Sequence, residues 1–428
     1  MKFFFPDSQD LVDPGFDFEK EEWTPNRVRQ RDDRYAHEIF RKPAFDGLLV
    51  SKGIVDGFGE TGSRYSIGQR QRLLRNGVRE FFRLDAARYP LPVIGDCGAF
   101  TYVKEEKPPY EVDEVVQFYA ECRFDYGISV DHVILDFQVD WDTDGSLVPE
   151  PVRARQELTL ELASEFYRTC KATKPGFEPL GVAQGWSPKS YARAVTALQK
   201  MGYDYIALGG MVPLKTREIL LSLDAVSRVR KPKTRLHLLG VTRTDAIVRF
   251  ADFGVASFDS TSPLRQAFKD DRDNYYTADR AYTAIRIPQV EGNATLQKLI
   301  FSGAVNQGLA RKLETACLKA MRDFEACKIS AKKVMKLLLE YDAVSRPHKT
   351  ESALSKRKGQ AGEHESLYLE VLEAAPWRSC PCEICRSLGH HVILFRGAER
   401  NRRRGFHNLF VFYRRLQREV RRGVLAVA

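Results

Sequence analysis

The amino-acid sequence predicts an α/β protein, a (β/α)8 TIM-like barrel with a C-terminal zinc-binding subdomain. Short runs rich in Val, Ile and Leu recur along the chain, and helical patterns lie between several of them, as in a parallel sheet buried on both faces. Near the C-terminus, three cysteines and a histidine have the spacing of a metal site. A doubly wound open sheet is the alternative, but no Gly-x-Gly-x-x-Gly follows a first strand.

The order of apolar runs and helical patterns defines the expected elements. Strands are expected at 45–51, 92–96, 132–136, 179–184, 205–209, 236–241 and 255–259, with 282–287 as a candidate eighth. Helices are expected at 188–201, 216–226, 244–250, 296–299, 307–327 and 330–341. We therefore expect an N-terminal extension at 1–44, a catalytic barrel with trailing helices at 45–345, and a linker with a zinc-binding, arginine-rich subdomain at 346–428.

The metal prediction comes from Cys380-Pro-Cys382-Glu-Ile-Cys385, followed by His407. Four such ligands complete a closed tetrahedral zinc site, which is structural because no position stays open for chemistry. The alternatives are free structural thiols or a redox pair, and His390 or His391 could supply the fourth ligand instead. We favour His407 because it opens an apolar helical run.

Composition and charge bound the class of protein. Hydrophobic residues make up 43% of 428, enough for a large core. We expect a cytoplasmic protein without a signal peptide or membrane span, since no long apolar run is present and the other cysteines are scattered. The net charge of +10 favours a polyanionic partner. An arginine-rich run from 396 to 422, including Arg402, Arg403 and Arg404, predicts contacts to nucleic-acid phosphates, with a solvated helix face as the alternative.

Polar residues end several of the expected strands, and in a barrel these ends meet at one mouth. They are Asp96, Asp136, Gln184, the pair Gly209 and Gly210, and Asp259. Carboxylates there could cap helices, bind a metal, or perform a double displacement at a sugar carbon. In the last case one carboxylate attacks C1′ and another moves protons, while the amide and the third carboxylate bind a base.

Several motifs resemble those of the tRNA-guanine transglycosylases. Asp96-Cys-Gly-Ala-Phe100 is similar to their Asp-Ser-Gly-Gly-Phe-Gln, and Val182-Ala-Gln-Gly185 to their Val-Gln-Gly-Gly. Ala207-Leu-Gly-Gly210, Leu239-Gly-Val241 and Gly254-Val-Ala-Ser-Phe-Asp259 resemble their Ala-Ile-Gly-Gly, Met-Gly-Val and Gly-Val-Asp-Met-Phe-Asp. The cysteine cluster and His407-Asn-Leu409 resemble the family's zinc signature.

The resemblance implies a barrel that exchanges bases by a ping-pong mechanism. By position, Asp259 is the nucleophile on C1′ and Asp96 is the general acid and base. Asp136 and Gln184 bind the base, and the Gly209–Gly210 pair offers the Gly210 N–H to its carbonyl oxygen. A structural Zn²⁺ is bound by Cys380, Cys382, Cys385 and His407.

Departures from the tRNA enzymes resemble the DNA-acting (DpdA-type) branch, which is linked to inserting 7-cyano-7-deazaguanine into DNA in place of guanine. The tRNA enzymes have two arginines after the nucleophile, and the corresponding positions here are Arg265 and Phe268. In the segment after the glycine pair, Met211-Val-Pro-Leu-Lys215, Lys215 stands where the bacterial tRNA enzymes have an acidic residue. Ala99 and Thr101 replace a Gly and a Gln beside the general acid.

The expected function is therefore a DNA-guanine transglycosylase. Its partners are DNA and a free 7-deazaguanine base, and helper proteins could open the strands. The alternatives are a tRNA transglycosylase, a catalytically silent zinc-stapled subunit, and a two-carboxylate glycosidase. A silent subunit is disfavoured because Asp259 and Asp96 are both present.

Overall fold

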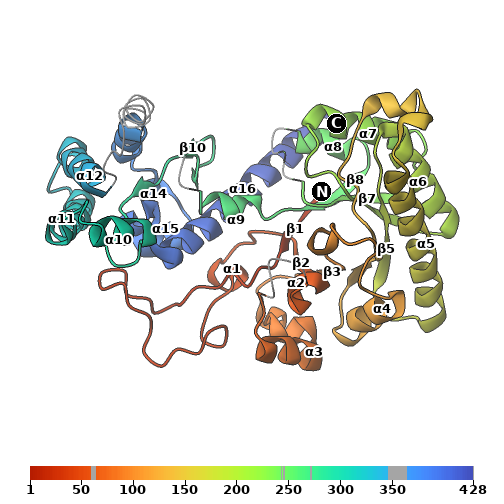
Figure 1. Ribbon diagram of the computed structural model, residues 1–428, viewed down its shortest axis with the longest axis horizontal. Helices are drawn as coiled ribbons and strands as arrows, with labels where there is room; N and C mark the ends of the chain where they lie inside the picture. The colour runs from red at the N-terminus through yellow and green to blue at the C-terminus, as the bar shows by residue number, and fades with distance from the viewer. Residues whose placement is uncertain (59–63, 242, 244–245, 270–271, 346–363, 428) are drawn as a thin grey trace. The chain divides into compact units, whose positions relative to one another are not determined.

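Eight parallel strands close into a barrel in the computed structural model (Figure 1). Their bounds are β1 Lys2–Pro6, β2 Gly47–Ser51, β3 Val93–Asp96, β4 Tyr126–Ile128, β5 Glu178–Ala183, β6 Tyr205–Leu208, β7 Arg235–Leu238 and β8 Val255–Asp259. Strand β1 pairs with both β2 and β8, with Phe4 opposite Gly47 and Asp259, and so completes the closure. The predicted barrel is confirmed.

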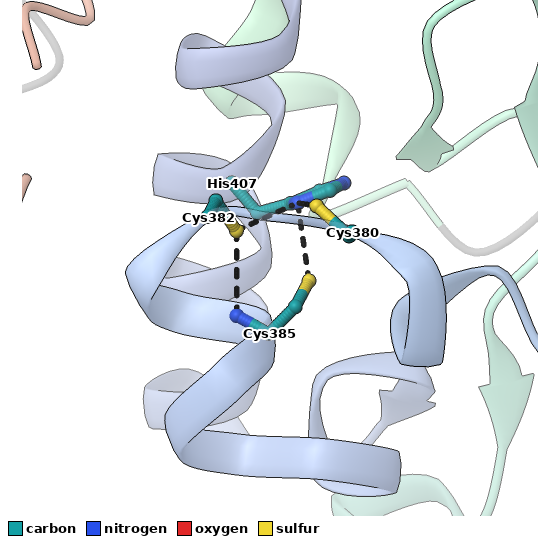
Figure 2. A group of neighbouring side chains, drawn as sticks. All are labelled: Cys380, Cys382, Cys385 and His407. Carbon is teal, nitrogen blue, oxygen red and sulfur yellow. Dashed lines mark hydrogen bonds between the residues drawn. The ribbon is translucent and has the colours of Figure 1, made fainter.

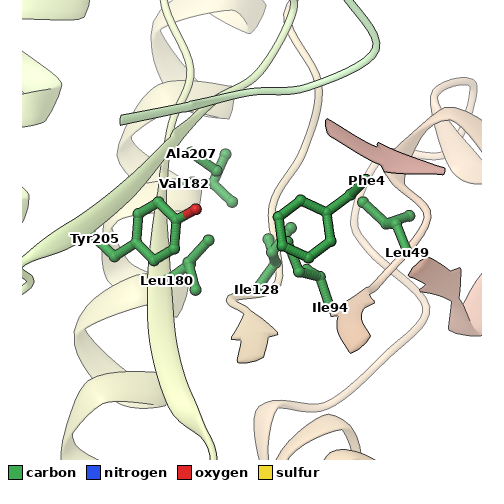
Figure 3. Close-up of a cluster of buried hydrophobic side chains, with 8 residues drawn as sticks. All are labelled: Phe4, Leu49, Ile94, Ile128, Leu180, Val182, Tyr205 and Ala207. Atoms are coloured by element: carbon green, nitrogen blue, oxygen red, sulfur yellow. The ribbon is translucent and has the colours of Figure 1, made fainter. Parts of the chain in front are cut away.

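Side chains that point inward from the strands fill the barrel. Figure 3 shows this core, which contains Phe4, Leu49, Ile94, Ile128, Leu180, Val182, Tyr205 and Ala207. These residues come from six neighbouring strands, and none is more than 5% exposed. The barrel is thus a packed core, and a ligand can approach only from its ends.

Helices follow the strands and cover the outside of the barrel (Figure 1). They are α2 Lys52–Asp56, α3 Ile67–Phe81, α4 Val112–Glu121, α5 Glu150–Thr173, α6 Pro188–Met201, α7 Thr216–Ser227 and α8 Ile247–Ala251. Helix α6 has the predicted ends: the Ser187 hydroxyl accepts from the Ser190 N–H, and Gly202 adopts a φ of 113° after the last turn.

The structure describes residues 1–58, 64–241, 243, 246–269, 272–345 and 364–427, and it divides into two units. Unit 1 contains Met1–Asp10, Phe45–Thr261 and Leu416–Ala428, and unit 2 contains Leu11–Ala44 and Ser262–Arg415. Residues 346–363, at the start of the linker and subdomain expected at 346–428, lie outside the described residues. No helix within the described ranges is long and apolar enough to cross a membrane.

Unit 2 is mainly helical, with two small two-stranded sheets. Its elements are α1 Ala36–Ile39, α9 Ser262–Gln266, β9 Tyr275–Tyr276, β10 Ala281–Tyr282, β11 Ile285–Arg286, α10 Ala294–Phe301, α11 Gln307–Glu325, α12 Ala331–Ser345, α14 Pro376–Ser379, α15 Glu383–Leu388, β12 Leu394–Phe395 and the first part of α16 Gly397–Val427. The three helices expected after the barrel correspond to α10, α11 and α12.

Three strand assignments from the sequence are wrong. The first barrel strand is Lys2–Pro6, inside the segment expected to be an extension of loops. The expected eighth strand at 282–287 lies in unit 2 and contributes to the small sheets β9–β10 and β11–β12. The strand expected at 132–136 is instead Tyr126–Ile128, and residues 132–136 belong to the loop that follows it.

Candidate active site and metal centre

Polar side chains gather where the barrel strands end. Asp96 and Asp259 are the last residues of β3 and β8, while Gln184 and Gly209 directly follow β5 and β6. Because all eight strands are parallel, these ends lie at the same mouth of the barrel. The structure thus brings together four of the five polar strand ends that the sequence identified.

The Asp96 carboxyl is surrounded by protein and by other carboxyl groups. Burial is the main cause that raises its pKa to about 7, and the negative charges of Asp131 and Asp259 raise it further. A carboxyl with this pKa exchanges its proton near neutral pH, which is the property required of a general acid and base.

A second buried carboxyl, Asp131, lies in the loop after β4 and is 2% exposed. Its Oδ2 accepts a hydrogen bond from Gln184 Nε2 at 2.6 Å, and its Oδ1 lies 3.1 Å from the Cys97 thiol. Burial raises the pKa of Asp131 to about 6. Gln184 is held from its other side as well, because its Oε1 accepts from the Ile134 N–H at 3.2 Å.

The aspartate that lies beside Gln184 is Asp131, whereas the sequence interpretation expected Asp136 there. Asp136 is exposed, five residues further along the same loop. The correction follows from the position of β4, which ends at Ile128 rather than at residue 136. The sequence offered two candidates here, since Tyr126-Gly-Ile-Ser-Val-Asp131 is also an apolar run that ends in aspartate.

Gly209 and Gly210 form a tight turn against Gln184. A Cβ on Gly209 would lie 2.1 Å from Gln184 Nε2, and one on Gly210 would lie 2.3 Å from the Ile134 carbonyl oxygen. Gly210 also has a φ of 69°, which favours glycine. The Tyr191 hydroxyl, on α6, donates to the Gly209 carbonyl at 2.8 Å and fixes the peptide plane between the two glycines.

Asp259 receives two hydrogen bonds on one oxygen. Its Oδ1 lies 3.1 Å from His237 Nε2 and accepts from the Gly240 N–H at 3.0 Å. The side chain is 6% exposed, and His237 is fully buried on β7. The sequence interpretation did not assign a role to His237, because a histidine within a strand has no local feature that marks it as part of a site.

The three cysteines and His407 converge in unit 2, and Figure 2 shows their side chains pointing toward one another. Their ligand atoms all lie within 4.8 Å of each other. His407 Nδ1 lies 3.6, 3.4 and 3.3 Å from the Sγ atoms of Cys380, Cys382 and Cys385. Tetrahedral bonds of about 2.3 Å to sulfur and 2.1 Å to nitrogen would separate these atoms by about 3.6 Å. The cluster can therefore hold a metal ion such as zinc.

Residues around the cluster orient its ligands. His407 Nε2 lies 2.7 Å from the Tyr276 carbonyl oxygen, which only accepts, so the ring proton sits on Nε2. Nδ1, which faces the cysteines, is then unprotonated and can bind a metal. Tyr275 stacks on the His407 ring at 4.2 Å, and the Cys385 N–H donates to Cys382 Sγ at 3.3 Å. His391, the competing ligand, instead lies 3.2 Å from Glu19.

Three arginines of α16, Arg400, Arg403 and Arg404, are buried. Arg404 is fully buried and donates to the carbonyl oxygens of Val392, Leu394 and Ala267. Arg403 is 7% exposed and donates to the Asp13 carbonyl. Burial therefore corrects the expectation that Arg403 and Arg404 contact phosphates.

Two further arginines from the sequence interpretation differ in exposure. Arg402 is partly buried and paired with Glu399 at 3.1 Å. Arg265, on α9, is exposed.

A parallel eight-stranded barrel with a carboxylate-lined mouth and a Cys3His cluster defines a class of protein, the base-exchanging enzymes of the tRNA-guanine transglycosylase superfamily. No family model matches the sequence. The sequence is 47% identical over 418 residues to a DNA-guanine transglycosylase of Salmonella montevideo, and the match covers 97% of each chain. The chain belongs to the DNA-guanine transglycosylase family, whose members are glycosyltransferases.

Proposed function

We propose that this protein exchanges guanine in DNA for 7-cyano-7-deazaguanine through a covalent aspartyl-glycosyl intermediate. The observation that carries the proposal is the pair Asp96 and Asp259. These two carboxyls end strands at one barrel mouth, and the negative charge of Asp259 raises the pKa of Asp96. The name of the relative supports DNA as the substrate. The net charge of +10 suits a polyanion.

In the first half-reaction Oδ2 of Asp259 attacks C1′ of the target nucleotide. The C1′–N9 bond breaks, guanine leaves with the bonding electrons, and it takes a proton from Asp96. In the second half-reaction Asp96 removes the N9 proton of the incoming base. The N9 electron pair then attacks C1′ and displaces the Asp259 carboxylate. The pKa of about 7 suits Asp96 to both directions of proton transfer.

Asp131 and Gln184 would bind the base that occupies the mouth. Their mutual hydrogen bond holds both side chains in one orientation, which reduces the entropy lost when a ligand binds. A Gly210 N–H directed by the Tyr191–Gly209 hydrogen bond would donate to the carbonyl oxygen of a guanine or 7-deazaguanine. Base recognition by Asp131 replaces the role first given to Asp136.

Cys380, Cys382, Cys385 and His407 would hold Zn²⁺ as a structural ion. Four protein ligands close the coordination shell, so the metal stabilises the fold of unit 2 and leaves the chemistry to the barrel.

The target nucleotide must leave the base stack, because a buried carboxylate cannot reach C1′ within an intact duplex. We infer that the DNA offered to the site is flipped or single-stranded, and that helper proteins for strand opening are partners. Arg265 is exposed, which suits it to a phosphate contact.

The test offers radiolabelled guanine with duplex DNA, single-stranded DNA or bulk tRNA to the wild-type protein and to Asp259→Ala. Label in DNA that depends on Asp259 supports the proposal. Label in tRNA alone would establish the tRNA alternative. Exchange that survives Asp259→Ala would disprove the covalent mechanism.

A further inference from the structure

A chain of buried hydrogen bonds runs from inside the barrel to the proposed nucleophile. His237 Nδ1 lies 2.6 Å from the Ser257 hydroxyl, and that hydroxyl also bonds the Tyr205 hydroxyl. On its other side the ring reaches Asp259 Oδ1 through Nε2. His237 and Ser257 are fully buried and Tyr205 is 4% exposed, so these bonds are shielded from bulk solvent.

The donors and acceptors of this chain run in one direction when Asp259 is a carboxylate and the His237 ring is neutral. A carboxylate can only accept, so the His237 Nε2 must carry the proton. Nδ1 of the neutral ring is then an acceptor, which the Ser257 hydroxyl proton satisfies. The Ser257 oxygen in turn accepts from the Tyr205 hydroxyl. Each group thereby fixes the orientation of the next, and the imidazole is held in one tautomer.

We propose that His237 is a positioning residue that holds Asp259 Oδ1, together with the Gly240 N–H, so that Oδ2 is the oxygen that attacks C1′. The proposal rests on the function proposed above and deepens it. Two donors on Oδ1 prevent rotation of the carboxylate and leave Oδ2 as the more nucleophilic oxygen. The same donors stabilise the carboxylate when it leaves C1′ in the second half-reaction.

The position of the ring is set by its neighbours. His237 lies on β7 between β6 and β8, opposite Ala207 and Ser257. The edge of the Phe4 ring packs against it, with centroids 6.1 Å apart at 67°. The imidazole is therefore enclosed by the barrel core, and its reach to Asp259 depends on its length as much as on its hydrogen-bonding atoms.

This dependence provides a matched pair of variants. In His237→Gln the side-chain amide nitrogen lies near the original Nε2 and can still donate to Asp259. In His237→Asn the side chain is one methylene shorter, so its amide corresponds to Nδ1 and reaches Ser257 but not Asp259. His237→Phe fills the same space without any donor and tests packing alone.

The test measures single-turnover formation of the protein–DNA covalent intermediate, kcat, the KM for the base, and thermal unfolding. We expect His237→Phe and His237→Asn to lower kcat by about 10²-fold or more, with the KM for the base changed less than about threefold. We expect the kcat of His237→Gln to be at least about tenfold higher than that of His237→Phe or His237→Asn. The proposal is overturned if all three variants lose kcat equally while remaining folded, or if His237→Phe forms the intermediate at the wild-type rate.

A second measurement separates this proposal from the proposed function. The tautomer of His237 is read from the ¹⁵N shifts of histidine-labelled protein, assigned by the loss of one signal in His237→Gln. Protonated Nε2 with bare Nδ1 is expected, and the opposite tautomer would overturn the proposal even in an active enzyme. If the wild-type protein exchanges no base into any nucleic acid, the proposed function fails, and the tautomer still decides whether His237 holds Asp259.

Discussion

Gln184 Nε2 donates to Asp131 Oδ2 over 2.6 Å, which ties the end of β5 to the loop after β4. Both side chains are buried, and Gln184 also accepts from the Ile134 N–H, so its amide orientation is fixed. The pair presents fixed polar atoms beside Asp96, the group proposed to move the proton.

Asp131→Asn is expected to weaken binding of the base. The amide places an N–H donor where a carboxylate oxygen accepts, so either the Gln184 contact or a base contact is lost. We expect the KM for the base to rise about 10- to 100-fold in steady-state exchange. Asp136→Asn is the matched control on the same loop, and its KM should stay within about twofold because Asp136 is exposed. The reverse ranking of the two variants would contradict the assignment.

Tyr191→Phe tests the peptide plane between Gly209 and Gly210. Removal of the hydroxyl leaves the Gly209 carbonyl without that donor, so the Gly210 N–H is less well directed. We expect a loss of about 1 kcal/mol in the free energy of unfolding and a KM for the base raised about fivefold.

Tyr203→Phe is the control for Tyr191→Phe. Its hydroxyl is also buried and donates to the Ala163 carbonyl at 2.7 Å, so a similar loss of stability is expected. The KM should not change, because this hydrogen bond is not made to the glycine pair. Equal effects of the two variants on KM would show that the Tyr191 effect is one of stability alone.

The raised pKa of Asp96 predicts a pH dependence of stability. The group titrates at about 7 in the folded protein against 3.8 in an ordinary environment, so the folded state binds this proton more tightly. Its contribution is therefore fully present below about pH 4 and is lost as the pH rises through 7. We expect the free energy of unfolding to fall by roughly 2–4 kcal/mol between about pH 5 and pH 8.

Asp96→Asn carries no titrating carboxyl at this position and should reduce this dependence to the part that Asp131 contributes, since burial raises the pKa of Asp131 to about 6. The variant should be more stable than the wild type at pH 8. Urea unfolding across the pH series measures the effect, and Asp136→Asn should retain the wild-type slope. An unchanged slope in Asp96→Asn would refute the shifted pKa.

Cys382→Ser is expected to abolish metal binding and to destabilise unit 2. Loss of one of four ligands opens the coordination shell, and zinc sites of this kind contribute several kcal/mol to folding. Elemental analysis should find about one zinc per wild-type chain and almost none in the variant, with a lower Tm. Cys327→Ser removes an exposed thiol outside the cluster and should alter neither quantity. A metal-free wild type with the same Tm would argue against a structural ion.

Arg404→Ala should lower the stability of the protein, whereas Arg265→Ala should lower its affinity for DNA. Arg404 is buried and hydrogen-bonded to three backbone carbonyls, so its loss should cost about 3 kcal/mol or more of stability. Arg265 is exposed, and its removal should leave the Tm unchanged while lowering DNA affinity and reducing the salt slope by about 1. Unfolding and binding titrations at several salt concentrations separate the two, and unchanged DNA binding in Arg265→Ala would remove it as a phosphate contact.

Much of the barrel was predictable from the sequence because its buried parallel strands form short aliphatic runs. Strand β1 was missed because the segment Lys2–Pro6, Lys-Phe-Phe-Phe-Pro, contains no aliphatic residue, and its burial is decided by pairing with β2 and β8. The Cys3His cluster was predictable because three of its ligands are close in the sequence and the fourth, His407, precedes an apolar run, which the structure places inside α16.

The choice between Asp131 and Asp136 could not be made locally, since each ends an apolar run. The pairing of Ile94 with Tyr126 and of Ile128 with Leu180 decides where β4 stops. The arginines of α16 resemble a charged surface in the sequence. Their partners, such as the Asp13 carbonyl for Arg403, lie almost a chain length away and become visible only in the fold.

The pairing of β1 with β8 sets a constraint on the order of folding. Lys2 lies opposite Ser257, so this seam joins residues that are separated by most of the barrel sequence. Contacts between such distant segments form slowly, because the chain between them must first be ordered. During synthesis the aromatic strand β1 must wait for its second neighbour until β8 has left the ribosome. Until then its edge is open to pairing with other chains, so a delay in closing this seam exposes the chain to aggregation.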